Sequence, residues 1–371
     1  MKKLFLLSTV FLVCHSLNAQ ALDTLAKHVV LQDYDTGHVL FEKEADLPMT
    51  PSSMSKLMTI YVAFEQIKNG NFNLDHKFLI SEKAWRMQGS KMFLPLNDQA
   101  TMEDLLKGVI VQSGNDASVA LAEGIAGSEE VFVDLMNQKA KELGLTNSVF
   151  KNSTGWPEEG HIMSAKDLAI LSKRVIDDFP EFYQYFGIKE FTFNGIKQQN
   201  RNSLLDMSIG VDGLKTGHTE IAGYGVALSA KQNNRRLILV VNGLDTFKDR
   251  TNEAYKLLQY GFLNYENVEM FKKHQEVAKI KIEGGAEEQV PVTVAKDVIF
   301  TVPKLKKNQI RHEVVAHNVA APIRRNQVIG KLKVSLPDTA EKIEFNLIAV
   351  SDVAEIKWWQ SIPKKIKKLL S

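Results

Sequence analysis

Ser53 and Lys56 are the residues of this sequence whose types and spacing best fit a chemical reaction. They lie at the start of a predicted helix, in the segment Ser-Met-Ser-Lys. Residues three apart share a helix face, so the serine hydroxyl and the lysine amine can meet. An ordinary lysine, with a pKa of about 10.4, is a poor base near neutrality, but burial and a second nearby cation would lower that pKa. The pair predicts a serine nucleophile activated by a lysine.

The sequence offers no other activating group for a serine. It has no Gly-x-Ser-x-Gly segment, and its nine histidines show neither the spacing of a metal site nor an evident triad partner. Neither a metal nor another cofactor is expected. A Ser-x-x-Lys segment is common by chance, and alone it also fits a helix-capping Ser53 beside a solvated Lys56.

Two further motifs follow in the chain. A Ser-Gly-Asn motif at 113–115 falls in a break between two predicted helices, and a Lys-Thr-Gly motif at 215–217 falls on a predicted strand. Each motif alone also fits a turn or the end of a strand. All three motifs in this order are specific for enzymes in which a lysine helps a serine to form an acyl-enzyme.

Composition favours a two-domain protein. A chain of 371 residues has room for two domains, each with its own core. Lys plus Arg (46) nearly balances Asp plus Glu (44), so the overall charge gives no reason to expect nucleic acid as a partner.

The first 21 residues have the layout of a cleavable secretory signal. Two lysines precede an apolar run, and a small-x-small pattern ends at Ala21. The run is too short to span a hydrocarbon core of about 30 Å as a helix, although a retained anchor is the alternative. The only cysteine, Cys14, lies in this run. The mature chain therefore has no disulfide.

The periodicity of the mature chain changes twice. Residues 27–43 fit a β-hairpin, and helical spacing then dominates until the pattern changes to strands after Lys189. Strands and one helix over 248–262 follow, and short alternating segments beyond Val268 predict a small all-β domain. From Ile356, apolar residues at intervals of three and four alternate with lysines. This pattern predicts an amphipathic helix on an anionic membrane surface, with a solvated tail as the alternative.

The motifs resemble those of the penicillin-recognising serine enzymes, and within them the D-alanyl-D-alanine carboxypeptidases of the peptidase S11 family. The resemblance is carried by PSSMSKLMT, SGND, GHIMSAKDLA, NRNSLL, VDGLKTGHT and the final amphipathic tail. It implies an α+β transpeptidase/β-lactamase-like domain, with helices on an antiparallel sheet, followed by a small all-β domain and a C-terminal amphipathic helix. The expected parts are a signal peptide (1–21), a serine DD-peptidase domain (22–267), a β-rich domain (268–352) and a membrane-surface anchor (353–371).

The resemblance also implies roles for individual residues. Ser53 would attack the penultimate D-Ala carbonyl, Lys56 would take its proton, and Ser113 would relay a proton to the departing D-alanine. Backbone amides of Ser53 and His218 would form an oxyanion hole. The expected substrate-binding residues are Asn115, Lys215, Thr216, Gly217, His218, Arg250 and Arg201, with a surface or structural salt bridge as the alternative for both arginines.

These features predict an exported serine-type D-Ala-D-Ala carboxypeptidase that trims peptidoglycan stem peptides and is acylated by β-lactams. It would lie in the periplasm, attached peripherally to the outer face of the inner membrane. A DD-endopeptidase or a β-lactamase is the alternative in the same chemistry, but both usually lack the extra β domain and the tail. The alternative from another class is a catalytically silent penicillin-binding scaffold, and the intact Ser53, Lys56, Ser113 and Lys215 argue against it.

Overall fold

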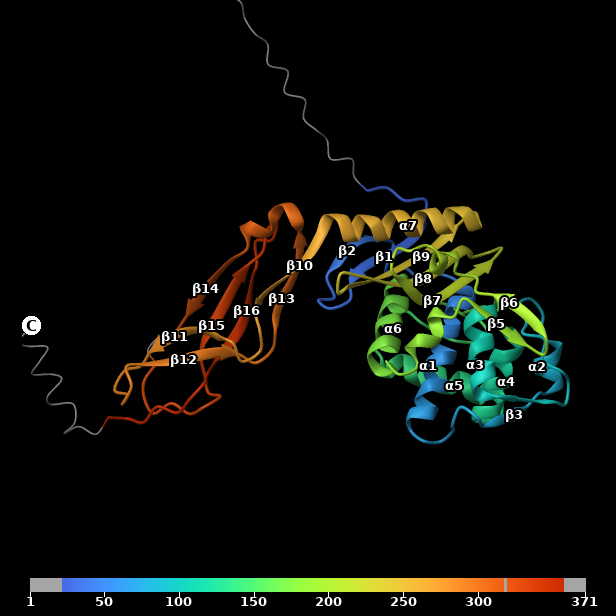
Figure 1. Cartoon of the computed structure of the whole chain (residues 1–371), viewed down its shortest axis with the longest axis horizontal. Helices are drawn as coiled ribbons and strands as arrows, with labels where there is room; N and C mark the ends of the chain where they lie inside the picture. Colours follow the sequence, from blue (N-terminus) through green and yellow to red (C-terminus); the bar gives the residue numbers. More distant parts are fainter. Residues whose placement is uncertain (1–21, 317–318, 357–371) are drawn as a thin grey trace, which may run out of the picture.

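The computed structural model describes residues 22–316 and 319–356. The predicted signal peptide (1–21) and all but the first four residues of the predicted anchor lie outside these ranges. The described chain forms a helix-rich N-terminal unit and a smaller β-rich C-terminal unit, arranged side by side along the long axis (Figure 1). None of the helices in these ranges is long and apolar enough to cross a membrane.

A five-stranded antiparallel sheet with the strand order β2-β1-β9-β8-β7 forms the centre of the N-terminal unit. The middle segments of β8 and β9 are buried continuously. They are therefore apolar runs rather than alternating segments, because layers cover both faces of the sheet. The strand bounds are β1 His28–Asp33, β2 Val39–Lys43, β7 Val211–Thr219, β8 Gly223–Gln232 and β9 Arg235–Leu244.

Helices cover both faces of this sheet. Helix α7 (Phe247–Asn264) lies on one face of the sheet and the other helices lie on the opposite face (Figure 1). Along β1, Val29 and Leu31 belong to the core under α7, whereas Val30 belongs to the core shared with the other helices. The central helix α1 is buried on all sides from Lys56 to Phe64. The remaining bounds are α1 Lys56–Lys68, α2 Glu82–Arg86, α3 Met102–Lys107, α4 Asn115–Ala126, α5 Glu129–Glu142, α6 Ala165–Asp178, β3 Lys77–Leu79, β4 Gln99–Thr101, β5 Glu190–Phe193 and β6 Ile196–Gln199.

The C-terminal unit is built from β-strands. One sheet pairs β10 with β13, and the other has the order β11-β12-β16-β15-β14. Val292, Phe300, Leu332 and Leu347 are among the residues of its separate core. The strand bounds are β10 Tyr265–Phe271, β11 Glu276–Lys281, β12 Gln289–Val294, β13 Val298–Pro303, β14 Arg311–Val315, β15 Val328–Ser335 and β16 Lys342–Ala349.

A buried polar network joins the two units. The fully buried carboxylate of Asp33 pairs with Arg235 at 2.8 Å and accepts a hydrogen bond from Asn267 Nδ2 at 3.1 Å. Thr301 Oγ1 donates to Asn267 Oδ1 at 2.7 Å and lies 2.6 Å from Thr36 Oγ1. These contacts join side chains of both units and hold the β-rich unit against the N-terminal unit.

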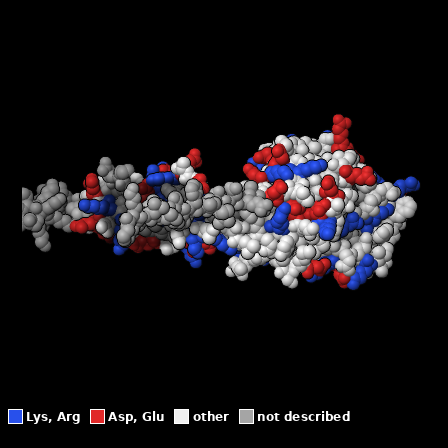
Figure 2. Space-filling view, turned by 90° about the horizontal axis from the view of Figure 1, so that it is seen from above, with Lys and Arg blue, Asp and Glu red and all other residues white. Residues whose placement is uncertain are grey.

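The expected fold class is confirmed for the described residues, whereas the domain boundary at 267/268 stays a prediction. The helix expected over 248–262 is α7, which is slightly longer at both ends. On the face seen in Figure 2, basic and acidic side chains are interspersed and form no single-sign patch, as the near balance of charges suggests.

Candidate active site

A short 3-10 helix (Ser52–Ser55) presents Ser53 at the start of α1. Between Pro51 and Phe64, Ser53 is the only residue that is not buried. Two glycines pack against this turn: a Cβ on Gly217 of β7 would collide with Ser52 Oγ, and one on Gly155 would collide with the Ser52 carbonyl. Glycine at both positions therefore allows β7 and the loop around Gly155 to approach the nucleophile closely.

Lys56 is fully buried and touches Ser53, as the helical spacing predicts. Its Nζ lies 2.9 Å from Ser53 Oγ, 2.7 Å from Asn115 Oδ1 and 2.5 Å from the Thr154 carbonyl oxygen. Burial, followed by the charge of Arg201, lowers the pKa of Lys56 to about 7. A neutral amine has two N–H groups and one lone pair. With the N–H groups donated to Asn115 and Thr154, the lone pair is left for the Ser53 hydroxyl.

We expect acylation of the protein to depend on pH through Lys56. Above a pKa of about 7 the amine is neutral and can accept the serine proton, whereas below it the amine is protonated and has no lone pair. The rate should therefore level off above neutrality and fall about tenfold per pH unit in acid. The measurement is the rate of labelling by a fluorescent penicillin across this pH range, and a flat profile would contradict the assignment of the base.

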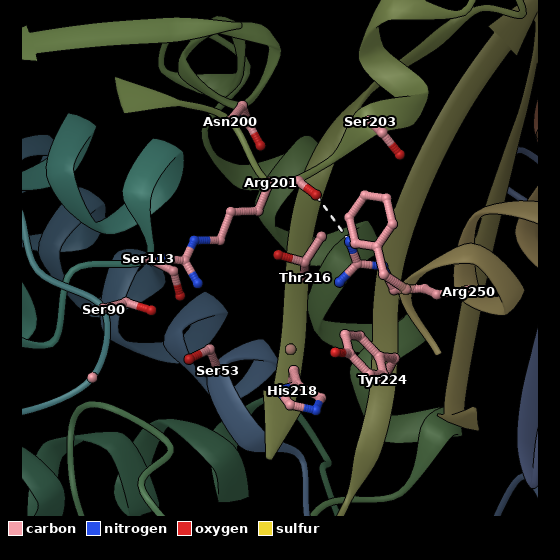
Figure 3. Close-up of a pocket in the computed structure, with 13 residues that line it drawn as sticks. Ser53, Ser90, Ser113, Asn200, Arg201, Ser203, Thr216, His218, Tyr224 and Arg250 are labelled. Atoms are coloured by element: carbon pink, nitrogen blue, oxygen red, sulfur yellow. Dashed lines mark hydrogen bonds between the residues drawn. The ribbon is translucent and has the colours of Figure 1, made fainter. Parts of the chain in front are cut away.

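Ser113 lies between a π-helical turn (Gly108–Gln112) and α4, with a left-handed backbone at φ 62°. This conformation is costly for a residue with a Cβ and is concentrated at functional sites. Ser113 Oγ is buried and has no hydrogen-bond partner within the described chain. The residue faces the same pocket as Ser53 (Figure 3). A buried, unpaired hydroxyl that lines a pocket is available to a bound molecule.

Asn115 connects Lys56 to the segment that closes one side of the pocket. Besides contacting Lys56, its side-chain Nδ2 donates to the Gln88 carbonyl at 2.7 Å, and its backbone N donates to the Ser90 carbonyl at 2.7 Å. The next residue, Asp116, accepts from the backbone N of Met92 at 2.9 Å. The start of α4 therefore fixes both the lysine base and the Gln88–Met92 segment.

The Lys-Thr-Gly motif places a buried lysine on β7. Lys215 and Thr216 are buried, and Lys215 Nζ donates to the Thr216 carbonyl at 3.1 Å. Burial and the neighbouring cations, first among them Lys56, lower the pKa of Lys215 well below its ordinary value. Among the neighbouring charges, Arg201 is the one that lowers the pKa of Lys56. His218 is exposed and stacks on Tyr224, with ring centroids 3.8 Å apart.

Arg201 and Arg250 supply positive charge to the pocket. The exposed Arg201 side chain extends across it toward Ser113 (Figure 3). Arg250 is buried, donates to the Arg201 carbonyl at 2.9 Å and lies over Phe247, and burial lowers its pKa to about 10. Neither guanidinium forms an ion pair with a carboxylate in the described parts of the chain. The resulting cavity of about 670 Å³ is suited to an anion.

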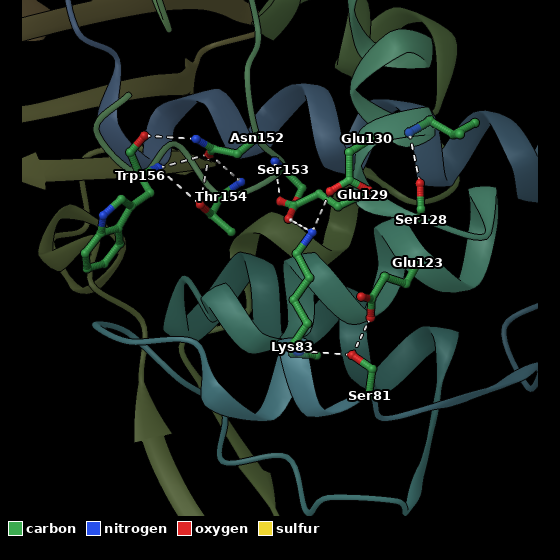
Figure 4. Close-up of polar contacts among 12 residues, drawn as sticks. Ser81, Lys83, Glu123, Ser128, Glu129, Glu130, Asn152, Ser153, Thr154 and Trp156 are labelled. Atoms are coloured by element: carbon green, nitrogen blue, oxygen red, sulfur yellow. Dashed lines mark hydrogen bonds and ion pairs between the residues drawn. The ribbon is translucent and has the colours of Figure 1, made fainter. Parts of the chain in front are cut away.

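Sequence reasoning missed the loop that supplies the Thr154 carbonyl. Asn152 Oδ1 accepts from the backbone N of Gly155 at 2.8 Å and of Trp156 at 3.1 Å (Figure 4). Glu129 accepts from Ser153 N at 2.9 Å and from Ser153 Oγ at 2.6 Å. The Asn-x-x-Gly spacing at 152–155 is a turn signal that could have identified this loop. Nothing in the sequence pointed to Glu129.

The site contains the groups needed to acylate a serine. It has a partly exposed hydroxyl, a buried amine in contact with it, a second unpaired hydroxyl and a cationic pocket. No cluster of three or more His, Cys, Asp or Glu side chains with the placement of a metal site occurs in residues 22–316 and 319–356.

Known proteins are similar to this chain in sequence and fold. Residues 15–246 match the peptidase S11 family of D-alanyl-D-alanine carboxypeptidases, and 265–355 match the C-terminal domain of penicillin-binding protein 5. The carboxypeptidase DacA of Haemophilus influenzae is 40% identical over 357 residues, 93% of this chain and 91% of that relative. Crystal structures of penicillin-binding protein 5 from Haemophilus influenzae match with a TM-score of 0.81 and 40% identity, over 90% of this chain and 98% of theirs. Ampicillin-bound penicillin-binding protein D2 from Listeria monocytogenes matches with a TM-score of 0.60 and 29% identity, over 65% of this chain and 98% of its own. The chain therefore belongs to the peptidase S11 family of D-alanyl-D-alanine carboxypeptidases.

Proposed function

We propose that the protein is a serine-type D-Ala-D-Ala carboxypeptidase that removes the terminal D-alanine from peptidoglycan stem peptides. The observation that carries the proposal is the contact of 2.9 Å between Lys56 Nζ and Ser53 Oγ, beside a pocket with two arginines that pair with no described carboxylate. Family membership and the names of relatives support the same reaction.

In the acylation step, Ser53 Oγ attacks the carbonyl carbon of the penultimate D-Ala, and its proton moves to Lys56 Nζ. The backbone amides of Ser53 and His218 stabilise the oxyanion. The peptide C–N bond then breaks, and Ser113 passes a proton to the amine of the departing D-alanine. Water hydrolyses the Ser53 ester in the second step and releases the shortened peptide. Asn115 orients Lys56 throughout.

The terminal carboxylate of the substrate lies in the cationic pocket. Arg201 and Arg250 supply positive charge, and the buried Lys215 of β7 adds positive potential. Thr216 and His218, also on β7, lie beside the substrate carboxylate. Gly217 allows the strand to lie against the serine turn. β-Lactams carry a carboxylate and a reactive amide in a similar relation, and we propose that they acylate Ser53. The ampicillin-bound state of the similar Listeria protein supports this part.

The decisive experiment compares a D-Ala-D-Ala peptide with its C-terminal amide. We expect release of D-alanine from the acid and a drop in kcat/KM of at least about a hundredfold for the amide, because charge-assisted hydrogen bonds contribute about 1.5–3 kcal/mol each. Arg201→Gln should reduce the difference by slowing the acid more than the amide. Arg174→Gln on α6 is the matched control. Equal kcat/KM for the two peptides would reject the carboxylate pocket.

Assays of D-alanine release, of cross-linked peptides and of β-lactam turnover separate the alternatives. A silent scaffold would bind penicillin without releasing D-alanine, a DD-endopeptidase would prefer cross-linked peptides, and a β-lactamase would release its β-lactam adduct rapidly. The β-rich unit matched by the penicillin-binding protein 5 C-terminal model favours the carboxypeptidase.

We also propose that the protein is exported to the periplasm and attached peripherally to the outer face of the inner membrane. The sequence supports this proposal with the signal-like stretch at 1–21 and the amphipathic pattern at 353–371. Between them we place the peptidase domain at 22–267 and the β-rich domain at 268–352.

The tail should bind anionic membranes. Its apolar groups, including Trp358 and Trp359, fall at helical intervals, and Pro363 fits the first turn of a short helix. Each lysine near an anionic surface contributes about 1 kcal/mol. In co-sedimentation with anionic vesicles, truncation after Ala354 should abolish binding without slowing hydrolysis of a soluble peptide. Undiminished binding by the truncated chain would place the anchor elsewhere.

A further inference from the structure

The carbonyl of Thr154 determines where the Lys56 amine directs its lone pair. In the neutral amine, the two N–H groups go to Asn115 Oδ1 and to the Thr154 carbonyl oxygen, and the lone pair faces the Ser53 hydroxyl. If that carbonyl moved away, one N–H group would be free to donate to Ser53 Oγ, and the lone pair would turn from the serine proton. Lys56 can therefore act as a base only while the carbonyl stays in place.

Two side chains outside the loop hold the residue that precedes Thr154. Thr59 Oγ1 on α1 donates to the Ser153 carbonyl at 2.7 Å. Glu129, at the start of α5, accepts from Ser153 N at 2.9 Å and from Ser153 Oγ at 2.6 Å (Figure 4). The bonds that Asn152 Oδ1 accepts from the next backbone N–H groups are internal to the loop, so they shape it but do not attach it to the helices. The Ser153 contacts therefore tie the loop to α1 and α5.

The carboxylate of Glu129 is itself fixed. Glu129 is buried, and its Oε2 pairs with Lys83 Nζ on α2 at 2.9 Å (Figure 4). Ser128 caps α5, so Glu129 lies in the first turn, where the helix dipole favours a negative charge. A charged acceptor also forms stronger hydrogen bonds than a neutral one. With one oxygen bound to Lys83 and the other to Ser153, Glu129 is a rigid anchor for the loop.

We propose that Glu129 is a positioning residue for the general base. Through Ser153 it holds the Thr154 carbonyl against Lys56 Nζ. The lysine lone pair then stays directed at the Ser53 hydroxyl. Glu129 lines neither the arginine pocket nor the neighbouring cavity beside Ser53, so it acts without touching a ligand there. The inference rests on the role of Lys56 in the proposed function, and it applies to acylation by a penicillin as well as by a peptide.

Glu129 acts through geometry rather than through its charge. The titratable groups that interact with Lys56 come from the elements around it: Arg201, Asp116, Lys215 and His161. Glu129 is not among the charges that shift the pKa of Lys56. A neutral glutamine at position 129 keeps an oxygen acceptor for Ser153, whereas alanine keeps none. Glutamine should therefore preserve the role of the residue, and alanine should remove it.

The test measures the rate of labelling by a fluorescent penicillin on both sides of neutral pH. We expect Glu129→Ala to slow acylation by about ten- to a hundredfold above neutrality, because the displaced amine loses its alignment with the hydroxyl. The inflection should also move to a lower pH, because the Thr154 carbonyl accepts more strongly from the ammonium than from the neutral amine. Glu129→Gln should keep the wild-type inflection and a rate within about threefold of the wild type, since Lys83 retains its second partner, Glu130.

Glu253→Ala is the matched control, because Glu253 on α7 has the same kinds of contact. It is buried, accepts from Thr24 Oγ1 at 2.6 Å and from Leu25 N at 3.3 Å, and pairs with Lys256 at 2.7 Å. It does not line the arginine pocket. The control should lower the melting temperature by an amount similar to that of Glu129→Ala, while keeping the wild-type acylation rate and inflection.

Three results would overturn the role of Glu129. The first is a wild-type rate in Glu129→Ala. The second is a loss of rate that leaves the inflection at its wild-type pH or that Glu253→Ala shares, because the defect would then be structural. The third is a loss in Glu129→Gln as large as that in Glu129→Ala, because the charge would then matter rather than the acceptor.

Ser153→Ala tests the same link if Glu129→Ala does not fold. It removes one of the two donors to Glu129 and should slow acylation by about two- to tenfold, the usual effect of one hydrogen bond. A wild-type rate in Ser153→Ala would then overturn the proposal. Release of D-alanine by the wild-type protein is measured separately. Its absence would reject the proposed carboxypeptidase, whereas penicillin labelling of the variants would still decide the role of Glu129.

Discussion

Replacing Ser53 with alanine should abolish both penicillin labelling and release of D-alanine, by at least about a thousandfold. No other hydroxyl is in contact with the Lys56 amine within the described chain. The change removes one oxygen from a partly exposed position, so the fold should be retained. The measurements are labelling with a fluorescent penicillin, mapping of the adduct after digestion, and a D-alanine release assay.

Ser351→Ala in the C-terminal unit is the matched control and should be labelled like the wild type. A melting temperature close to that of the wild type would show that Ser53→Ala is folded. Labelling that survives in this variant, or an adduct mapped to another residue, would sink the assignment of the nucleophile.

Local spacing made part of the site predictable. Ser53 and Lys56 are only three residues apart at the start of a helix, so their contact depends on local helix geometry alone. The structure has this contact. Asn115 reaches the same amine from 59 positions away, and only the order of the motifs suggested it. The Thr154 carbonyl, 98 positions from Lys56, has no residue-type signal, because every residue has a carbonyl. Tertiary packing alone places it.

The fold, like the site, has features that local sequence patterns predicted and features that they did not. Apolar periodicity predicted the hairpin of β1 and β2 and the last helix, α7. The pairing of β1 with β9 joins residues about two hundred positions apart, and spacing within a strand does not specify such partners. The resemblance suggested an antiparallel sheet, and the structure supplies its strand order. The left-handed backbone of Ser113 had no local signal, because such positions usually carry glycine or asparagine.

Replacing Lys56 with methionine should slow acylation by about a hundredfold to ten-thousandfold, the usual contribution of a general base. Methionine is unbranched and flexible, so it fills most of the volume of this fully buried side chain. The acceptors on Asn115 and Thr154 lose their donor, which costs about 1–3 kcal/mol for each buried group left unsatisfied. The variant should therefore fold with reduced stability. Stopped-flow labelling with a fluorescent penicillin and thermal melting measure the two effects.

The pH profile of the variant separates loss of the base from a structural defect. If Lys56 is the group that titrates near pH 7, its removal also removes that inflection, and the residual rate becomes nearly independent of pH there. Lys77→Met, at an exposed lysine on β3, should keep both the rate and the inflection. An inflection near pH 7 that persists in Lys56→Met would assign the base to another group. Lys215 would then be the first candidate, because it is the other buried amine in the pocket region and its pKa is also lowered.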